Sequence, residues 1–333
     1  MRFFKRYSKI FIILSLLLLI SIVLASSLGA VKLPGKWIIR TLLGLPTDGN
    51  DYWHLIFWQV RLPRVLGAAL VGAALALAGT AFQGVLRNPL ADPYILGVSS
   101  GASLGAAIMS LLPLKNTTVF WSLAAFAGAL LVTFTVYSLA SRGIVRRVED
   151  LILAGVAMGS LTSSIVSIIL VLNRSSMDKV IMWMMGSLSG ISWQSILVLL
   201  IYLTPGFLLL YCRSRELNAL LLGEEAAWNL GVDVVRETRF ILTIASLLAA
   251  VAVSVSGVIG FVGLMVPHIL RIILGPDHRL LLPASLFGGA ILLVITDCVA
   301  RTVIAPTELP VGVITSLLGA PFFLYLLKRN KKN

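Results

Sequence analysis

The sequence is built from apolar runs of roughly the length that crosses a lipid bilayer as one helix, about 20 residues. The runs follow one another with short connections and cover residues 10–29, 64–86, 94–112, 118–140, 151–172, 193–212, 239–259, 261–274, 281–304 and 310–327. The eighth run is short and contains Pro267. The pattern predicts an all-α polytopic membrane protein with about ten transmembrane helices, in one transmembrane domain over residues 1–333.

The composition excludes a soluble enzyme and a soluble binding module. Charged residues make up 12% of the chain and hydrophobic residues 58%, whereas a water-facing surface needs roughly a quarter of its residues charged. Disorder is excluded as well, because disordered chains have low hydrophobicity. The two cysteines, Cys212 and Cys298, lie in or beside apolar runs and are too few for a disulfide framework.

The basic residues predict how the chain is oriented in the membrane. In a soluble protein the net charge of +13 would suggest nucleic acid, but here Lys and Arg lie in short loops between apolar runs. With both termini cytoplasmic, the inner segments hold about twice as many basic residues as the outer ones. We therefore predict cytoplasmic termini, an uncleaved first helix and no nucleic-acid partner. Arg61 and Arg64 lie on the predicted outer side and need a separate explanation.

Two connections are longer than the rest. Residues 30–60 contain Trp37, Trp53 and Trp58, which predicts an extracytoplasmic segment at the membrane interface. Residues 213–239 form the largest inner loop, which is amphipathic and helix-prone, with a glycine at the end of each half.

The sequence lacks the motifs that several kinds of chemistry require. No P-loop occurs, so ATP is not bound in that way, and His54, His268 and His278 are too far apart in sequence to suggest a metal site. Within the spans, Asp297 has Arg301 four residues later, which predicts an ion pair on one helix face. Because proton-coupled carriers usually have more intramembrane carboxylates, a secondary transporter is the weaker alternative. A membrane-embedded enzyme would need paired catalytic groups that the sequence lacks.

Ordered motifs connect the chain to a known family. Glu225-Ala226-Ala227-x-x-x-Gly231 has the pattern by which permeases of ABC importers contact their ATPase. Other segments that resemble motifs of such permeases are Arg61–Arg64, Arg87–Gly101, Gly257–Arg271, Asp277–Pro283, Glu308–Thr315 and Leu318–Phe323. From about residue 60 to 327 the chain resembles the FecCD-type (type II) permeases, which import iron-siderophores, haem or vitamin B12 into bacteria.

The resemblance implies a multi-pass subunit of the bacterial cytoplasmic membrane that is not itself an enzyme. Its implied partners are a second permease copy or a close paralogue, two ABC ATPase subunits that carry the ATP and Mg, and an extracytoplasmic substrate-binding protein. The chain itself would hold no cofactor and no metal. Ferric siderophore is the expected cargo only because that branch is the commonest, and vitamin B12 and haem stay open.

The resemblance also implies three groups of site residues. The ATPase-docking group is Leu222, Gly223, Glu224, Glu225, Ala226, Ala227 and Gly231. The binding-protein docking group is Arg61, Arg64 and Arg301, and the cytoplasmic gate is Asn88, Pro89 and Leu90. Simpler alternatives are a surface helix for the first group, arginines anchored at the membrane interface for the second and a reverse turn for the third. Glu149 and Asp150, at the start of a span, fit a helix N-terminus better than a gate.

Overall fold

The computed structural model describes residues 2–29, 31, 33–45, 51–112, 117–140 and 148–330, and these contain helices and their connections without a β-strand. The longer helices are α1 (Arg2–Ser27), α4 (Leu62–Val85), α5 (Val98–Met109), α6 (Thr117–Ala140), α7 (Val148–Leu172), α9 (Trp193–Cys212), α12 (Val234–Ser256), α13 (Val262–Leu274), α14 (His278–Thr302) and α15 (Val311–Asn330). The shorter ones are α2 (Gly35–Leu42), α3 (Asp51–Leu55), α8 (Met177–Met184), α10 (Ser214–Leu221) and α11 (Glu224–Asn229), the π-helix η1 (Ile56–Arg61), and the 3-10 helices η2 (Pro93–Leu96) and η3 (Arg174–Ser176).

The helices confirm the predicted polytopic fold. Among the described residues, 7 helices are long and apolar enough to span a membrane, and α5, α13 and α15 contain shorter apolar helical segments. Each predicted run corresponds to one of these helices. The third span begins later than predicted, at Val98, because η2 and then Gly97, whose φ is +78°, interrupt the chain before it.

The centre of the bundle is α4. In the most apolar part of the helical segment Tyr52–Val85, which contains α4, 89% of the residues are buried. The corresponding value for α1, at the periphery, is 17%. The central helix packs most extensively on α14 and next on α12. Its small residues allow this approach, since a Cβ atom on Gly72 would overlap the backbone carbonyl of Gly289 in α14. Gly72 therefore holds α4 and α14 in close backbone contact.

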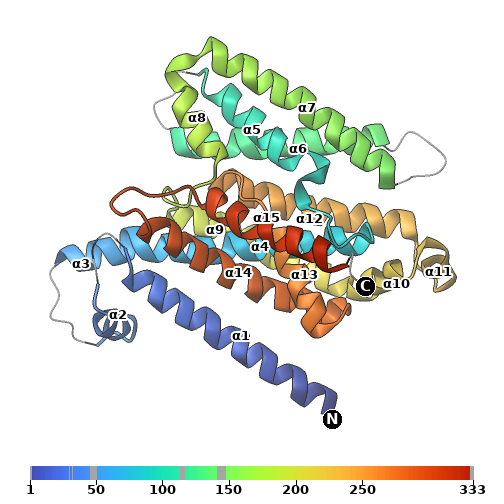
Figure 1. The fold of residues 1–333 in the computed structure, drawn as a ribbon, viewed down its shortest axis with the longest axis horizontal. Helices are drawn as coiled ribbons and strands as arrows, with labels where there is room; N and C mark the ends of the chain where they lie inside the picture. The colour runs from blue at the N-terminus through green and yellow to red at the C-terminus, as the bar shows by residue number, and fades with distance from the viewer. Residues whose placement is uncertain are drawn as a thin grey trace.

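The other helices surround α4 in layers (Figure 1). One layer contains α5, α6 and α7, which pack on one another and reach the centre through the contact of α6 with α12. On the opposite side, α1 lies along α14. Figure 1 shows both chain termini toward the right-hand side, where α10 and α11 lie. This arrangement agrees with termini and docking loop on one side of the membrane.

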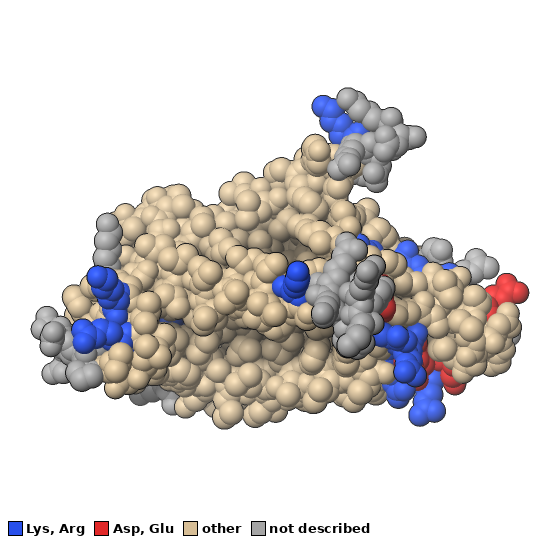
Figure 2. Space-filling view, turned by 90° about the horizontal axis from the view of Figure 1, so that it is seen from below, with Lys and Arg blue, Asp and Glu red and all other residues tan. Residues whose placement is uncertain are grey.

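Charged side chains also follow the long axis. Figure 2 shows Lys and Arg at the left-hand end and a mixture of basic and acidic side chains toward the right-hand end. A broad uncharged surface separates them, as a lipid-facing wall requires. In the predicted interfacial segment, Trp37 and Ile38 of α2 pack on Phe57 of η1, and the position of this segment in the membrane stays a prediction.

Candidate functional site

The predicted ATPase-docking loop forms two short helices, α10 and α11, at one end of the bundle. Gly223 separates the helices with a φ of +112°, and Gly231 ends α11 with a φ of +81°. L-residues with side chains rarely adopt such angles. At the second turn the Val232 N–H donates to the Ala227 carbonyl. Both glycines are therefore required by the backbone path, as the sequence suggested for Gly231.

The surface of this loop is unusual for an end of the molecule that carries many charges. Leu222 and Trp228 are each 68% exposed and Leu230 is 64% exposed. Large apolar side chains so exposed outside the membrane are typical of a protein–protein contact. Glu224 and Glu225 are exposed beside them, Ala226 is half-buried, and Ala227 is fully buried against the bundle. Ala227 therefore packs inside the bundle and is not part of the exposed surface of the loop.

Asn218 joins the docking loop to α14. Its side-chain amide donates to the Asp277 carboxylate at 2.7 Å. Its side-chain oxygen accepts from the His278 backbone N–H at 2.8 Å and lies 2.8 Å from the ring Nδ1 of His278. Asp277 also caps α14 by accepting from the Arg279 backbone N–H. These hydrogen bonds therefore link α10 directly to the start of α14.

The predicted gate residues form a turn at the same end of the molecule. The Asn88 side chain accepts from the Leu90 N–H at 2.9 Å, so the turn is held locally. Asn88, Pro89 and Leu90 are all exposed, Leu90 by 49%. The preceding Arg87 forms an exposed ion pair with Glu224 of α11 at 3.5 Å. The structure therefore brings the gate turn and the docking loop together, although an exposed pair of this kind contributes little stability.

The chain after this turn is fixed by Asp92 and Tyr94. The Asp92 carboxylate caps η2 by accepting from the Tyr94 N–H at 2.8 Å, and burial raises the pKa of Asp92 to about 6. The Tyr94 hydroxyl donates to the Ile259 carbonyl at 2.9 Å, in the connection between α12 and α13. These bonds anchor the connection between α4 and α5, so that only the tip around Leu90 projects freely.

At the opposite end of the bundle, two of the predicted docking arginines share one carboxylate. Asp297 of α14 lies 3.0 Å from Arg64 of α4 and 2.9 Å from Arg301, so the predicted pair of Asp297 with Arg301 is confirmed. Arg64 also pairs with Glu308 at 2.8 Å. The guanidinium groups are buried, but 43% of the Glu308 side chain is exposed. Removing one partner of such a group leaves a buried charge uncompensated.

Arg61 points elsewhere. It donates to the carbonyls of Ser26, Ser27 and Val31, at and just after the end of α1. Arg61 and Arg64, which were both predicted to contact a binding protein, therefore do not form one exposed surface, since they are 5% and 6% exposed and bind different partners. The physical reason is that unpaired guanidinium groups at this depth would be costly. Whether Arg61, Arg64 and Arg301 bind a partner protein stays a prediction.

One face of the bundle carries a cavity of about 600 Å³ between α8, α15 and the connection from α12 to α13. The described residues of its lining are uncharged and include Met184, Met185, Gly260 and Ser316. His268 of α13 lies near this region and packs edge-on against Phe322 and Phe323 of α15. A wall of this composition offers a large solute few strong polar contacts.

Three features of these sites were missed by the sequence analysis. The junction formed by Asn218, the link from Arg87 to Glu224 and the pairing of Arg64 with Glu308 all join residues far apart in the sequence. Asp277 directly before a helical run is a usual N-cap signal, and this signal could have identified one member of the first junction.

Comparison with known proteins shows what the chain is similar to. The model of the FecCD transport family matches residues 17–329. The cobalamin import permease BtuC of Halobacterium salinarum is 46% identical, over 83% of this chain and 74% of its own. The hemin transport permease HmuU of Yersinia pestis is 40% identical, over 96% of both chains. A solved structure described as an inward-facing ABC transporter of the metal-chelate type has a TM-score of 0.85 and 30% identity, over 97% of this chain and 99% of its own.

Proposed function

Because this chain belongs to the FecCD transport family, we propose that it forms the pathway of an importer for a bulky metal chelate, together with a second permease copy. It is a multi-pass permease of the cytoplasmic membrane and a subunit of an ABC importer. Two separate ATPase subunits would bind and hydrolyse ATP, and an extracytoplasmic binding protein would deliver the cargo.

The docking loop supports the ATPase part of this proposal. The exposed side chains Leu222, Trp228 and Leu230 offer an apolar contact for the ATPase on the cytoplasmic side. Movement of this contact would reach α14 through Asn218 and the gate turn through Arg87 and Glu224. One displacement would then act on the bundle and on the gate together.

For the cargo we propose a corrinoid such as cobalamin, with haem and ferric siderophore as the alternatives. The observation that carries this choice is the 46% identity to a cobalamin import permease. The cavity wall with Met184, Met185 and Gly260 is compatible with it, because the described residues of this wall carry no charge that would retain a large neutral or amphipathic chelate. The earlier preference for siderophore depended on a base rate alone.

The experiment is uptake into liposomes that contain the permease with its ATPase, with the binding protein added outside. ATP enclosed with the ATPase should drive accumulation of radiolabelled cobalamin, and competition by haem and by a ferric siderophore would rank the three cargos. ATP-dependent uptake of the siderophore without uptake of cobalamin would reverse the choice of cargo. Uptake that persists without the ATPase would instead support a secondary transporter.

A further inference from the structure

A groove on the flank of the bundle is not explained by the transport pathway. It lies over α12 between α6 and α9 and has a volume of about 450 Å³. Its lining includes Leu123 and Phe126 of α6 and Val198 and Tyr202 of α9. Leu123 is 57% and Val198 42% exposed, as expected for side chains that face lipid. The stretch of α6 that lines the groove, from residue 119 to 126, is about 10 Å long at 1.5 Å per residue.

The groove continues into a second cavity with a different chemistry. This cavity has a volume of about 500 Å³ and shares Ser122, Gly190 and Val255 with the groove. It lies beside α8, at the end of the bundle opposite α10 and α11 (Figure 1). Given the orientation of the chain, this is the extracytoplasmic boundary of the membrane. The two cavities together form one continuous surface that changes from apolar to polar along α6.

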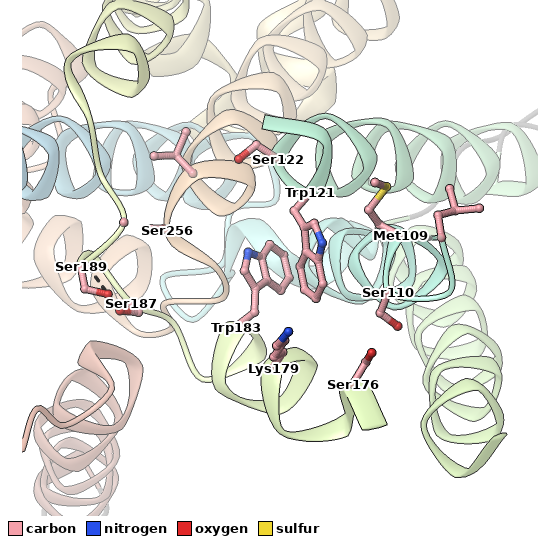
Figure 3. A pocket seen from close by; sticks show the side chains of 13 residues that line it. Met109, Ser110, Trp121, Ser122, Ser176, Lys179, Trp183, Ser187, Ser189 and Ser256 are labelled. Atoms are coloured by element: carbon pink, nitrogen blue, oxygen red, sulfur yellow. Dashed lines mark hydrogen bonds between the residues drawn. The ribbon is translucent and has the colours of Figure 1, made fainter. Parts of the chain in front are cut away.

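The polar cavity contains unpaired donors. Figure 3 shows the Trp121 and Trp183 rings close together, with the side chains of Lys179 and Ser176 directed toward the same space. Among the described residues, neither the Lys179 ammonium nor the hydroxyls of Ser122 and Ser176 have a hydrogen-bond or ion-pair partner. Lys179 is the one charged side chain among the described residues of the lining. The cavity therefore offers an anion the Lys179 ammonium and, on the same side of the tryptophan rings, the Ser176 hydroxyl.

We propose that these two cavities bind one anionic phospholipid of the outer leaflet. Its phosphate would lie at Lys179 beside the Ser176 hydroxyl, and one acyl chain would pass Ser122 and follow the groove between α6 and α9. Lysine at a membrane surface attracts anionic lipid headgroups, and tryptophan is favoured at the depth of the headgroups. The groove is lined by exposed apolar side chains, so the ligand that fits it is an amphiphile that enters from the bilayer.

The two cavities of the proposed site share no described lining residue with the uncharged cavity beside α15. The proposal therefore does not depend on the identity of the cargo. Bound lipid would bridge α6, α8 and α9, and so would stabilise the layer of α5 to α7 against the centre of the bundle.

The test is the thermal unfolding of the purified full-length permease in detergent with added lipid. Phosphatidylglycerol should raise the unfolding temperature of the wild type by several degrees more than phosphatidylcholine with the same acyl chains. Lys179→Ala should remove most of this difference. The control is Lys36→Ala, which deletes an exposed lysine of α2 that lines neither cavity, and this variant should keep the difference.

Three outcomes would overturn the proposal. Equal effects of the two lipids would mean that the headgroup charge is not recognised. An undiminished preference for phosphatidylglycerol in the Lys179→Ala variant would place the lipid elsewhere. Stabilisation by glycerol phosphate equal to that by phosphatidylglycerol would mean that the site takes a free phosphate and no acyl chain.

A second measurement does not depend on stability. Phosphatidylglycerol with brominated acyl chains quenches tryptophan that it touches, and the quenched fraction should fall in the Trp121→Phe variant relative to the wild type. The quenched fraction should also be lower in the Lys179→Ala variant than in the wild type. Equal quenching in all three proteins would also overturn the proposal.

Discussion

At the scale of single residues, the outer arginines illustrate how buried charge is accommodated. Arg64, Asp297 and Arg301 satisfy one another inside the bundle, while the Glu308 side chain reaches the surface. A guanidinium that is removed from water needs a carboxylate at close range. In this protein the carboxylate that solvent can reach is Glu308, so it is the member of the network that a partner protein could replace.

The replacement of Glu308 can be tested with Glu308→Gln. This change leaves Arg64 paired with Asp297 but weakens its second contact, so a carboxylate of the binding protein should compete for Arg64 more easily. We expect affinity for the binding protein to rise several-fold at low salt and the gain to shrink as salt screens the charges. Surface plasmon resonance across a salt series measures both effects.

The control for this prediction is Asp178→Asn, which removes an exposed acidic charge of α8 without changing a partner of Arg64. It should have a smaller effect than Glu308→Gln. An equal gain in both variants would show that only the net charge matters, and unchanged affinity in the Glu308 variant would separate Arg64 from docking.

At the scale of helices, coupling depends on the junction between α10 and α14. The Asn218→Ala variant loses the bonds to Asp277 and His278, at a cost to stability of about 1–3 kcal/mol. We expect ATP hydrolysis to continue in the assembled complex while uptake falls several-fold, because the docking loop would move without displacing α14. The ratio of cargo transported to ATP hydrolysed in liposomes measures this uncoupling.

Asn173→Ala is the matched control for this experiment. It deletes the same amide at the other end of the bundle, with two side-chain bonds, one to the Ser110 carbonyl and one from the Ser175 hydroxyl. Its transport ratio should be that of the wild type. If both variants change the ratio equally, the effect reflects general loss of stability and not the junction.

At the scale of the whole molecule, the predicted gate depends on how the turn at Leu90 meets a second copy of the chain. Leu90 projects from an anchored turn and is 49% exposed in the single chain. If a two-fold axis passes beside the turn, Leu90 of one copy faces Leu90 of the other. After replacement of Cys212 and Cys298, a Leu90→Cys variant should crosslink between copies in the closed state and less in the nucleotide state that opens the pathway inward.

Solute leakage gives an independent measure of the gate. Leu90→Ala should let small solutes pass. An apolar constriction excludes water and solutes from a closed pore, and the smaller alanine side chain would widen it. If no nucleotide state gives the crosslink and the alanine variant does not leak, the turn is a structural connection and the pathway closes elsewhere.

The sequence by itself determined the class of the protein, the approximate bounds of its spans and the two turning glycines of the docking loop. These features are local. A span is a run of neighbouring apolar residues, an N-cap or a left-handed glycine depends on the residues next to it, and the pair of Asp297 with Arg301 follows from one turn of helix.

Only the tertiary structure decided which distant groups meet. Arg64 and Asp297 are separated by 233 residues and Asn218 and Asp277 by 59, and nothing in their spacing selects one partner over another. For the same reason the sequence placed Arg61 and Arg64 in one predicted docking group, whereas the packing of α1 and α14 around α4 gives each arginine its own buried partners. The lipid groove depends even more on packing, because its walls come from α6 and α9, which both pack on α12 and meet at Phe126 and Tyr202.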